Sequence, residues 1–169
     1  MNIVDPSGMY AYHDEEDKIH IPVVWTGKGK PPDTVRKAVD QAKEKYAKQD
    51  ISVDFYESRQ AAEEAGLTEY NTMQRGNPGF GNRAQTDFNR NITLGDHANS
   101  GDVPHEIGHC MGLPDEYVVK NGVKELKQPS TTLGIEVNPS VRSVMYSGAG
   151  EVTSTHKKIG DAFIRSRGY

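Results

Sequence analysis

Residues 103–117 have the sequence VPHEIGHCMGLPDEY, and no other stretch of the chain carries as much chemical information. It contains a His-Glu-x-x-His pattern in which His105 and His109 are four residues apart. On a helix, side chains at this spacing share one face and lie about 5–6 Å apart. Both imidazoles can then bind one metal ion. The stretch therefore predicts a helix over residues 102–111 that carries a zinc site.

The residues around the two histidines supply the other parts of a catalytic zinc site. Glu106 can reach a water on the metal without being a ligand, as a general base requires. Two imidazoles leave zinc under-coordinated, so a third ligand must come from beyond the helix while a fourth position stays open for water. Gly112 ends the helix, and Asp115 follows three residues later. We expect His105, His109 and Asp115 to bind Zn²⁺.

Three other side chains compete for the position of third ligand. Glu116 directly follows Asp115, whereas Glu151 and His156 lie nearer the C-terminus. Spacing favours Asp115, with Glu151 second. If Glu151 or His156 joined Asp115, four protein ligands would close the site, which is typical of structural zinc. A binding module with a structural, non-catalytic metal is therefore the alternative function.

The segments that precede this helix indicate an α+β fold that begins with a βαβ unit. Alternating apolar residues predict strands over 18–25 and 51–56, and apolar side chains at helical spacing predict an amphipathic helix over 33–49. The strands of such a unit run parallel. Because proline cannot donate a ladder hydrogen bond, we expect Pro22 to place the first strand at a sheet edge.

The remaining pattern predicts shorter elements. We expect a short helix over 58–66, a strand over 91–95 and a C-terminal helix capped by Ser154 or Thr155, while Asp102 is the expected cap of the metal-binding helix. Residues 71–90 are rich in Gly, Asn and Gln and lack periodicity, so we expect a loop. We expect a specificity pocket to form within residues 68–90 and the polar connection 118–139.

The pattern His-Glu-x-x-His-x-x-Gly-x-x-Asp resembles the metzincin clan of zinc endopeptidases, in its variant with Asp as third ligand. Residues 143–146, SVMY, resemble the Met-turn of that clan, and the order of predicted elements agrees over most of the chain. The resemblance implies a small, mixed, twisted sheet, an active-site helix, a Met-turn and a C-terminal helix. It also implies that Met145 forms an apolar floor beneath the zinc ion.

The same resemblance implies a function. The protein is expected to be a metalloendopeptidase that hydrolyses peptide bonds, with Glu106 as the base and a polypeptide as substrate. The strand at 91–95 resembles the clan's edge strand, with which an extended substrate could pair. Tyr146 is a candidate donor to the oxyanion of the transition state. Amide bonds of cell-wall peptides form a second possible substrate class.

A second resemblance concerns the N-terminus. Residues 2–9, NIVDPSGM, resemble the Asp-Pro-x-Gly junction that precedes the C-terminal toxin domain of Rhs-type polymorphic toxins. It implies a junction segment over residues 1–12 and a single metallopeptidase domain over 13–169, delivered into a target cell as a type VI secretion effector. A parent Rhs protein and a cognate immunity protein would be its partners. The first residues have no signal-peptide pattern, so outside that delivery route the protein would be cytoplasmic.

Composition excludes several other functions. The chain has 169 residues, 20 Lys and Arg against 24 Asp and Glu, and a net charge of −4, so we expect no nucleic-acid partner. Its longest apolar runs are far shorter than the ~20 residues that cross a bilayer, so we expect a soluble protein with no membrane partner. A monomer is the default expectation for its oligomeric state. The single cysteine, Cys110, cannot form an internal disulfide, and we expect it to be a small buried side chain.

Overall fold

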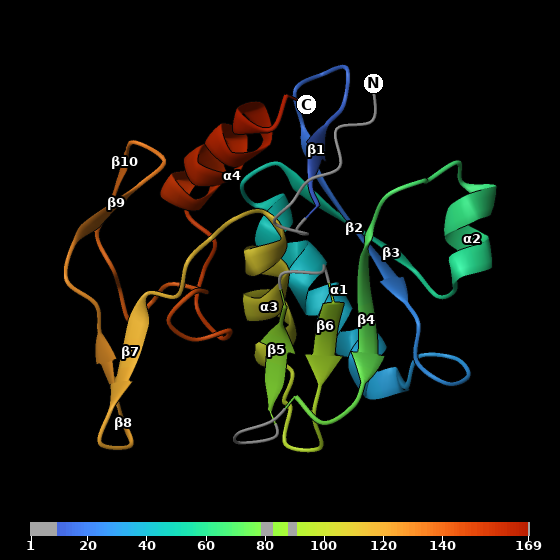
Figure 1. Ribbon diagram of the computed structural model, residues 1–169, viewed down its shortest axis with the longest axis horizontal. Helices are drawn as coiled ribbons and strands as arrows, with labels where there is room; N and C mark the ends of the chain where they lie inside the picture. The colour runs from blue at the N-terminus through green and yellow to red at the C-terminus, as the bar shows by residue number, and fades with distance from the viewer. Residues whose placement is uncertain (1–9, 79–82, 88–90, 169) are drawn as a thin grey trace.

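The computed structural model describes residues 10–78, 83–87 and 91–168, and it has an α+β fold, as expected (Figure 1). The βαβ unit is confirmed: β2 (Ile19–Trp25) and β3 (Ile51–Tyr56) are parallel neighbours and α1 (Asp33–Ala47) connects them. The apolar stripe of α1 packs into the core, with Val39, Ala42 and Tyr46 almost fully buried. Helical spacing of apolar residues therefore placed this helix correctly.

The main sheet is mixed and has six strands. Beyond the unit just described it contains β1 (Tyr12–His13), β4 (Asn71–Arg75), β5 (Ala84–Thr86) and β6 (Asn91–Leu94). The order is β1-β2-β4-β6-β5, and β3 pairs with the opposite side of β2. β4 and β6 run parallel to β2, whereas β1 and β5 are antiparallel to their neighbours.

Two expectations about the sheet were wrong. Residues 71–90 contain β4 and β5 rather than only loop, because in β4 the alternate residues Asn71 and Met73 are buried among polar neighbours and give little apolar signal. The strand at 91–95, observed as β6, is not an edge strand, since β4 and β5 flank it. Within the described part of the chain, β5 is the edge next to it.

Pro22 does not mark an edge either. The β1 ladder on β2 ends at His20 and the β4 ladder begins at Val23, so Pro22 lies in the gap between them. Its carbonyl faces this gap and accepts a hydrogen bond of 2.9 Å from the Asn71 side-chain amide. The missing N–H therefore costs no ladder hydrogen bond, and a central strand tolerates the proline.

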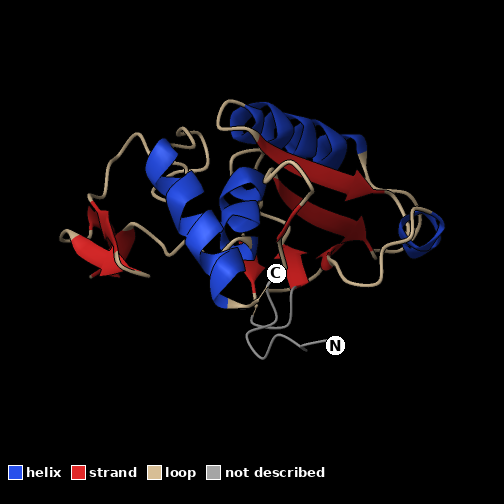
Figure 2. Cartoon of the chain, turned by 90° about the horizontal axis from the view of Figure 1, so that it is seen from above, coloured by secondary structure: helices blue, strands red, loops and turns tan. Residues whose placement is uncertain are grey.

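The fold has three further helices in the described residues. They are α2 (Arg59–Glu64), α3 (Asp102–Cys110) and α4 (Ser154–Ser166). α1 lies along one face of the sheet and contacts α3, as Figure 2 shows from above. Two expected caps were wrong by one residue: Gly101 precedes α3, and Thr153 caps α4, accepting a hydrogen bond from the His156 backbone N–H.

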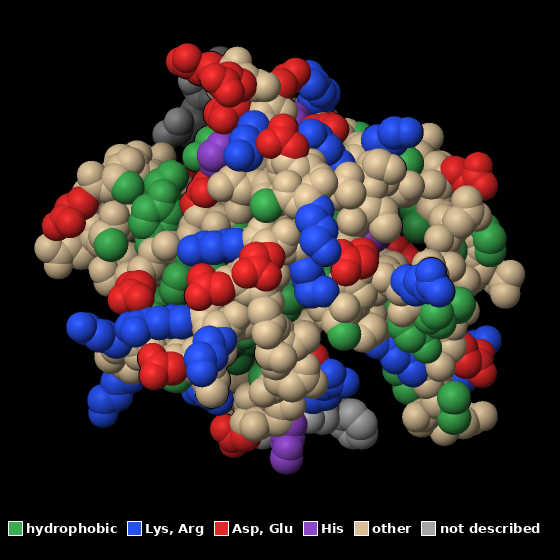
Figure 3. Space-filling view, turned by 180° about the vertical axis from the view of Figure 1, so that it is seen from behind, with side chains coloured by type: hydrophobic (Ala, Val, Ile, Leu, Met, Phe, Trp, Pro, Cys, Tyr) green, Lys and Arg blue, Asp and Glu red, His purple; other side chains and the backbone are tan. Residues whose placement is uncertain are grey.

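The polar connection 118–139 folds into two hairpins that project beside the main sheet (Figure 1). The first pairs β7 (Tyr117–Lys120) with β8 (Val123–Leu126), and the second pairs β9 (Ser130–Thr132) with β10 (Ile135–Val137). No helix in the described residues is long and apolar enough to cross a bilayer. On the face opposite to Figure 1, cationic and anionic side chains are interspersed, so that face carries no broad patch of one sign (Figure 3).

Gly112 is required by both its backbone and its surroundings. Its φ is +81°, and a Cβ added there would lie 2.2 Å from Cδ2 of Phe163. We predict that Gly112→Ala lowers the free energy of unfolding by about 2–4 kcal/mol, because a positive φ and overpacking both add cost. The control Gly122→Ala has φ +77° and nothing within 4 Å; it should cost only about 1–2 kcal/mol. Equal losses in urea denaturation of the two variants would contradict this account.

Candidate metal centre

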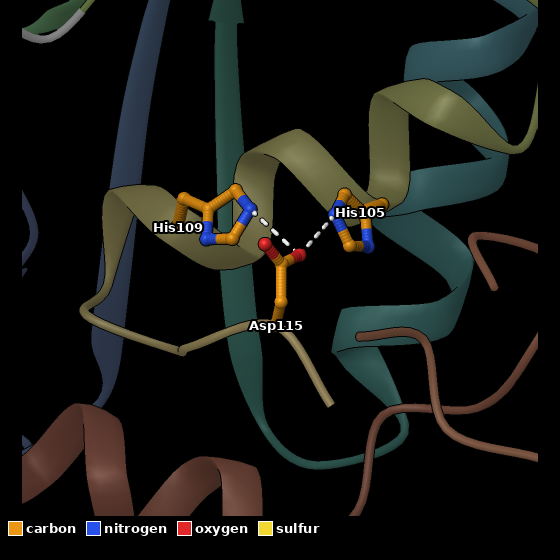
Figure 4. Close-up of side chains that lie close together, drawn as sticks. All are labelled: His105, His109 and Asp115. Carbon is orange, nitrogen blue, oxygen red and sulfur yellow. Dashed lines mark ion pairs between the residues drawn. The ribbon is translucent and has the colours of Figure 1, made fainter. Parts of the chain in front are cut away.

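Three of the side chains that the sequence singled out come together in the structure. His105 and His109 project from one face of α3, and Asp115 reaches them from the loop that follows the helix (Figure 4). Asp115 Oδ1 lies 3.0 Å from His105 Nε2 and 3.5 Å from His109 Nε2. We call these three residues the metal group.

Backbone carbonyls fix the orientation of both imidazoles. His105 Nδ1 lies 3.1 Å from the Val144 carbonyl oxygen, and His109 Nδ1 lies 2.8 Å from that of Leu113. A carbonyl only accepts, so each Nδ1 carries the proton and donates it. Each Nε2 then faces Asp115, which is the orientation that metal-ligating histidines need.

This arrangement fits a tetrahedral ion. Bonds of about 2.0–2.2 Å to zinc hold neighbouring ligand atoms about 3.3–3.6 Å apart, and the two His–Asp separations are close to that range. All three ligand atoms lie within 4.8 Å of one another. Asp115 Oδ1 is buried and, among the described residues, has no hydrogen-bond donor of suitable geometry. Three ligand atoms grouped in this way could hold a cation.

The electrostatics keep Asp115 in its charged form. Burial raises the pKa of this carboxyl group, but the interactions with His105 and His109 outweigh burial and hold its pKa well below the ordinary value. Burial lowers the pKa of His109, but Asp115 and Glu106 outweigh this effect, so its pKa is raised above 6.5. A proton therefore competes with a metal ion for the imidazole of His109.

Met145 lies against the helix that carries the histidines. Its side chain is fully buried, and a Cβ added to Gly108 would lie 2.4 Å from Met145 Sδ. The residues 143–147 form a turn, in which the N–H groups of Tyr146 and Ser147 donate to the Ser143 carbonyl. The methionine therefore packs against α3 at Gly108.

Glu106 sits next to the metal group without belonging to it. The side chain is buried, and its Oε2 accepts a hydrogen bond of 2.7 Å from Thr86 Oγ1 on β5. Sequence reasoning missed Thr86, because the contact joins residues 20 apart through a strand that the pattern did not indicate. Cys110 on the same helix is buried, and burial raises the pKa of its thiol, so it is a packing residue.

The rival third ligands lie elsewhere. Glu116 Oε1 is 2.8 Å from His156 Nε2 and accepts a hydrogen bond of 2.8 Å from Ser143 Oγ. His156 Nδ1 accepts from the Thr153 N–H, so Nε2 is the donor to Glu116. All three side chains of this Glu116 cluster (Glu116, Ser143 and His156) are at most 4% exposed. The cluster ties the loop after α3 to the turn at Met145 and to α4.

Glu151 is also engaged away from the metal group. Its carboxylate pairs with Lys48 at 3.0 Å on the surface. In the part of the chain that the structure describes, the only group of acidic, His and Cys side chains close enough to hold an ion is the metal group. Neither Glu151 nor His156 is placed to close the site as a fourth ligand.

A cavity of about 880 Å³ opens beside the site and is lined by His105 and Glu106. Both segments expected to form a specificity pocket contribute to it, through Arg83 from the first and Lys124 from the second. Tyr146 lines the cavity, and so does Tyr117, whose ring centroid is 6.0 Å from that of His105. Burial first, and then the nearby carboxylates, raise the pKa of Tyr117, which keeps this phenol protonated as a hydrogen-bond donor.

Loss of any member of the metal group should abolish stoichiometric zinc binding. For His105→Ala, His109→Ala and Asp115→Ala we expect the affinity for zinc to fall by more than the roughly 10–100-fold typical of lost outer hydrogen bonds.

The affinity of the wild-type protein for zinc should weaken as the pH falls through the raised pKa of His109, because protonation removes the lone pair of its imidazole. Calorimetric zinc titration measures both effects. His97→Ala, at an exposed histidine outside the group, is the control.

The Glu116 cluster should contribute to stability. Glu116→Gln removes the charge from a buried hydrogen-bonded pair, and we expect the metal-free protein to lose about 2 kcal/mol. Burial raises the pKa of Glu116, but His156, Ser140 and Ser143 outweigh it, so the folded-state pKa lies below 4.5. The stability from the ionised form is complete above pH 4.5 and disappears below it. The difference from wild type in chemical denaturation should therefore shrink on acidification.

Glu151→Gln is the matched control for that experiment. Its ion pair with Lys48 is exposed, so the same change should alter stability by less than about 0.5 kcal/mol. A Glu116→Gln protein as stable as wild type at neutral pH would show that the cluster contributes nothing.

No protein-family model matches this chain, and no curated protein matches it in sequence. What the site does chemically must therefore be argued from its own geometry.

Proposed function

We propose that the protein is a zinc-dependent endopeptidase of the metzincin type. The observation that carries the proposal is the convergence of His105 Nε2, His109 Nε2 and Asp115 Oδ1 on one point beside the Glu106 carboxylate and an open cavity. Three protein ligands with a free fourth position are typical of catalytic zinc, whereas structural zinc has four. The engagement of Glu151 with Lys48 and of His156 with Glu116 argues against the alternative of a closed, structural site.

Zinc supplies Lewis acidity when bound, and it lowers the pKa of a coordinated water to about 7. Residues of the chain supply proton transfer and hydrogen-bond donors. Glu106, oriented by Thr86, accepts a proton from the attacking water and returns it to the leaving amine. Tyr117 and Tyr146, on the cavity wall, are the candidate donors to the oxyanion that develops on the substrate carbonyl.

The biological setting belongs to the same proposal. Delivery as the toxin domain of an Rhs or type VI effector, with a cognate immunity protein, is supported only by the likeness of residues 2–9 to a shell junction. Those residues lie outside the described part of the chain. Tyr10 to His13 join the domain directly, because Ala11 is buried in the core and Tyr12 pairs with His20 on β2.

Glu106→Gln should separate metal binding from catalysis. The variant keeps all three ligands, so we expect unchanged zinc content, but its rate of peptide hydrolysis should fall by at least about 100-fold because the general base is lost. Casein digestion with a chelator control measures the rate, and elemental analysis measures the zinc. An unchanged rate would remove the proposed mechanism. Mapping of new termini after incubation with a target-cell lysate would then identify the bonds that the wild-type protein cleaves.

A further inference from the structure

The cavity beside the metal group is rich in cations, most of which already have partners. Lys45 Nζ donates to two backbone carbonyl oxygens at 2.9 and 2.7 Å. Lys48 pairs with Glu151 at 3.0 Å, and the Arg83 guanidinium pairs with the Asp102 carboxylate at 2.5 Å. These three side chains are therefore occupied within the protein.

Lys124 is the exception. Among the described residues, no carboxylate lies within ion-pairing distance (4.0 Å) of its Nζ, which donates instead to the Tyr146 carbonyl oxygen. The ammonium lies 3.7 Å from the centroid of the Tyr117 ring and 4.7 Å from that of Tyr146. Aromatic faces attract an ammonium, and an ammonium has three donors. The two rings hold the charge in place while donors remain for a ligand.

This cation stands close to the reacting centre. The Tyr117 ring that it covers is 6.0 Å from the His105 ring, so Nζ lies within about 10 Å of that imidazole. An extended peptide advances about 3.3–3.6 Å per residue. A group on the substrate one or two residues from the scissile bond therefore reaches Lys124.

The charges near Lys124 affect its ammonium in opposite directions. Burial lowers the pKa of Lys124, and the Arg83 guanidinium lowers it further, because the two cations share the space beside the site. Asp115 and Asp102 offset part of this repulsion. A negative group placed beside Lys124 would gain a charge-assisted hydrogen bond.

We propose that Lys124 binds a carboxylate of the substrate, so that the site selects peptides with an acidic group within two residues of the scissile bond. This inference rests on the proposed peptidase function and adds a substrate class to it. The carboxylate has two possible sources, an Asp or Glu side chain and a free C-terminus. Lys124 is thus a specificity-determining residue that touches substrate but takes no part in proton transfer.

The first test is cleavage of a proteome-derived peptide library by the zinc-loaded protein. We expect Asp and Glu to be enriched within two residues of the cleaved bonds. Matched peptides with Glu or Gln at that position and amidated C-termini should differ in kcat/KM by about tenfold or more. A Gln peptide whose free C-terminus lies one or two residues after the scissile bond tests the other source of the carboxylate, because it should be cleaved faster than its amidated counterpart if Lys124 binds the terminus.

Two substitutions of Lys124 test whether this residue causes the preference for acidic peptides. Lys124→Gln should reduce the Glu/Gln ratio of kcat/KM to near one, and Lys124→Glu should shift the preference toward Lys and Arg. Lys120→Gln, on the same hairpin but outside the cavity, is the matched control and should keep the wild-type ratio. Equal preference for Glu in wild type and Lys124→Gln would overturn the assignment.

A binding measurement gives a readout without turnover. Two dipeptide hydroxamates that differ only in Glu or Gln are titrated into zinc-loaded Glu106→Gln protein, with and without Lys124→Gln. The Glu probe should bind about tenfold tighter than the Gln probe, and only when Lys124 is present. Equal affinities would overturn the inference.

Failure of the proposed function and failure of this inference give different results. Absence of metal-dependent cleavage would overturn the proposed peptidase function, whereas cleavage with no acidic preference would overturn only the role of Lys124.

Discussion

The site depends on one electrostatic constraint, which is that two imidazole lone pairs and a carboxylate oxygen point at the same place. The orientation of these three groups depends on the backbone around them. The Val144 and Leu113 carbonyls orient the imidazoles by binding their Nδ1–H groups. Both carbonyls belong to the turns that surround α3, and therefore the backbone of these loops sets the direction of the ligands.

Asp115 and Glu116 show how neighbouring acidic residues acquire different roles. The chain is entering β7 at this point, and successive side chains of an extended segment point to opposite sides. Asp115 and Tyr117 consequently face the metal group and its cavity, while Glu116 faces Ser143 and His156. Glu116 anchors the loop to the Met145 turn and to α4, which keeps its neighbour in position. This alternation places Asp115, and not Glu116, beside the two histidines.

Those parts of the fold that follow local rules could be predicted from the sequence. The βαβ unit and α3 depend on apolar periodicity, and the pairing of His105 with His109 depends on the rise of one helical turn. The parts of the fold that were not predicted depend on contacts between residues that are far apart in the sequence. β4 has a polar sequence because only alternate residues are buried, and Pro22 is tolerated because the distant Asn71 fills its gap. Nothing in the sequence near Lys124 indicates that two tyrosines enclose it.

The position of β5 links the sheet to the chemistry of the site. β6 is paired on both sides, so an extended substrate has no free ladder there, and main-chain pairing would have to use β5. This strand contacts α3, and its Thr86 donates to the carboxylate of Glu106. Under the proposed function, a peptide aligned along β5 would therefore be positioned by the same strand that orients Glu106. The position of the Glu106 carboxylate relative to β5 is set by the contact of one strand with one helix, which is a more rigid arrangement than a loop would provide.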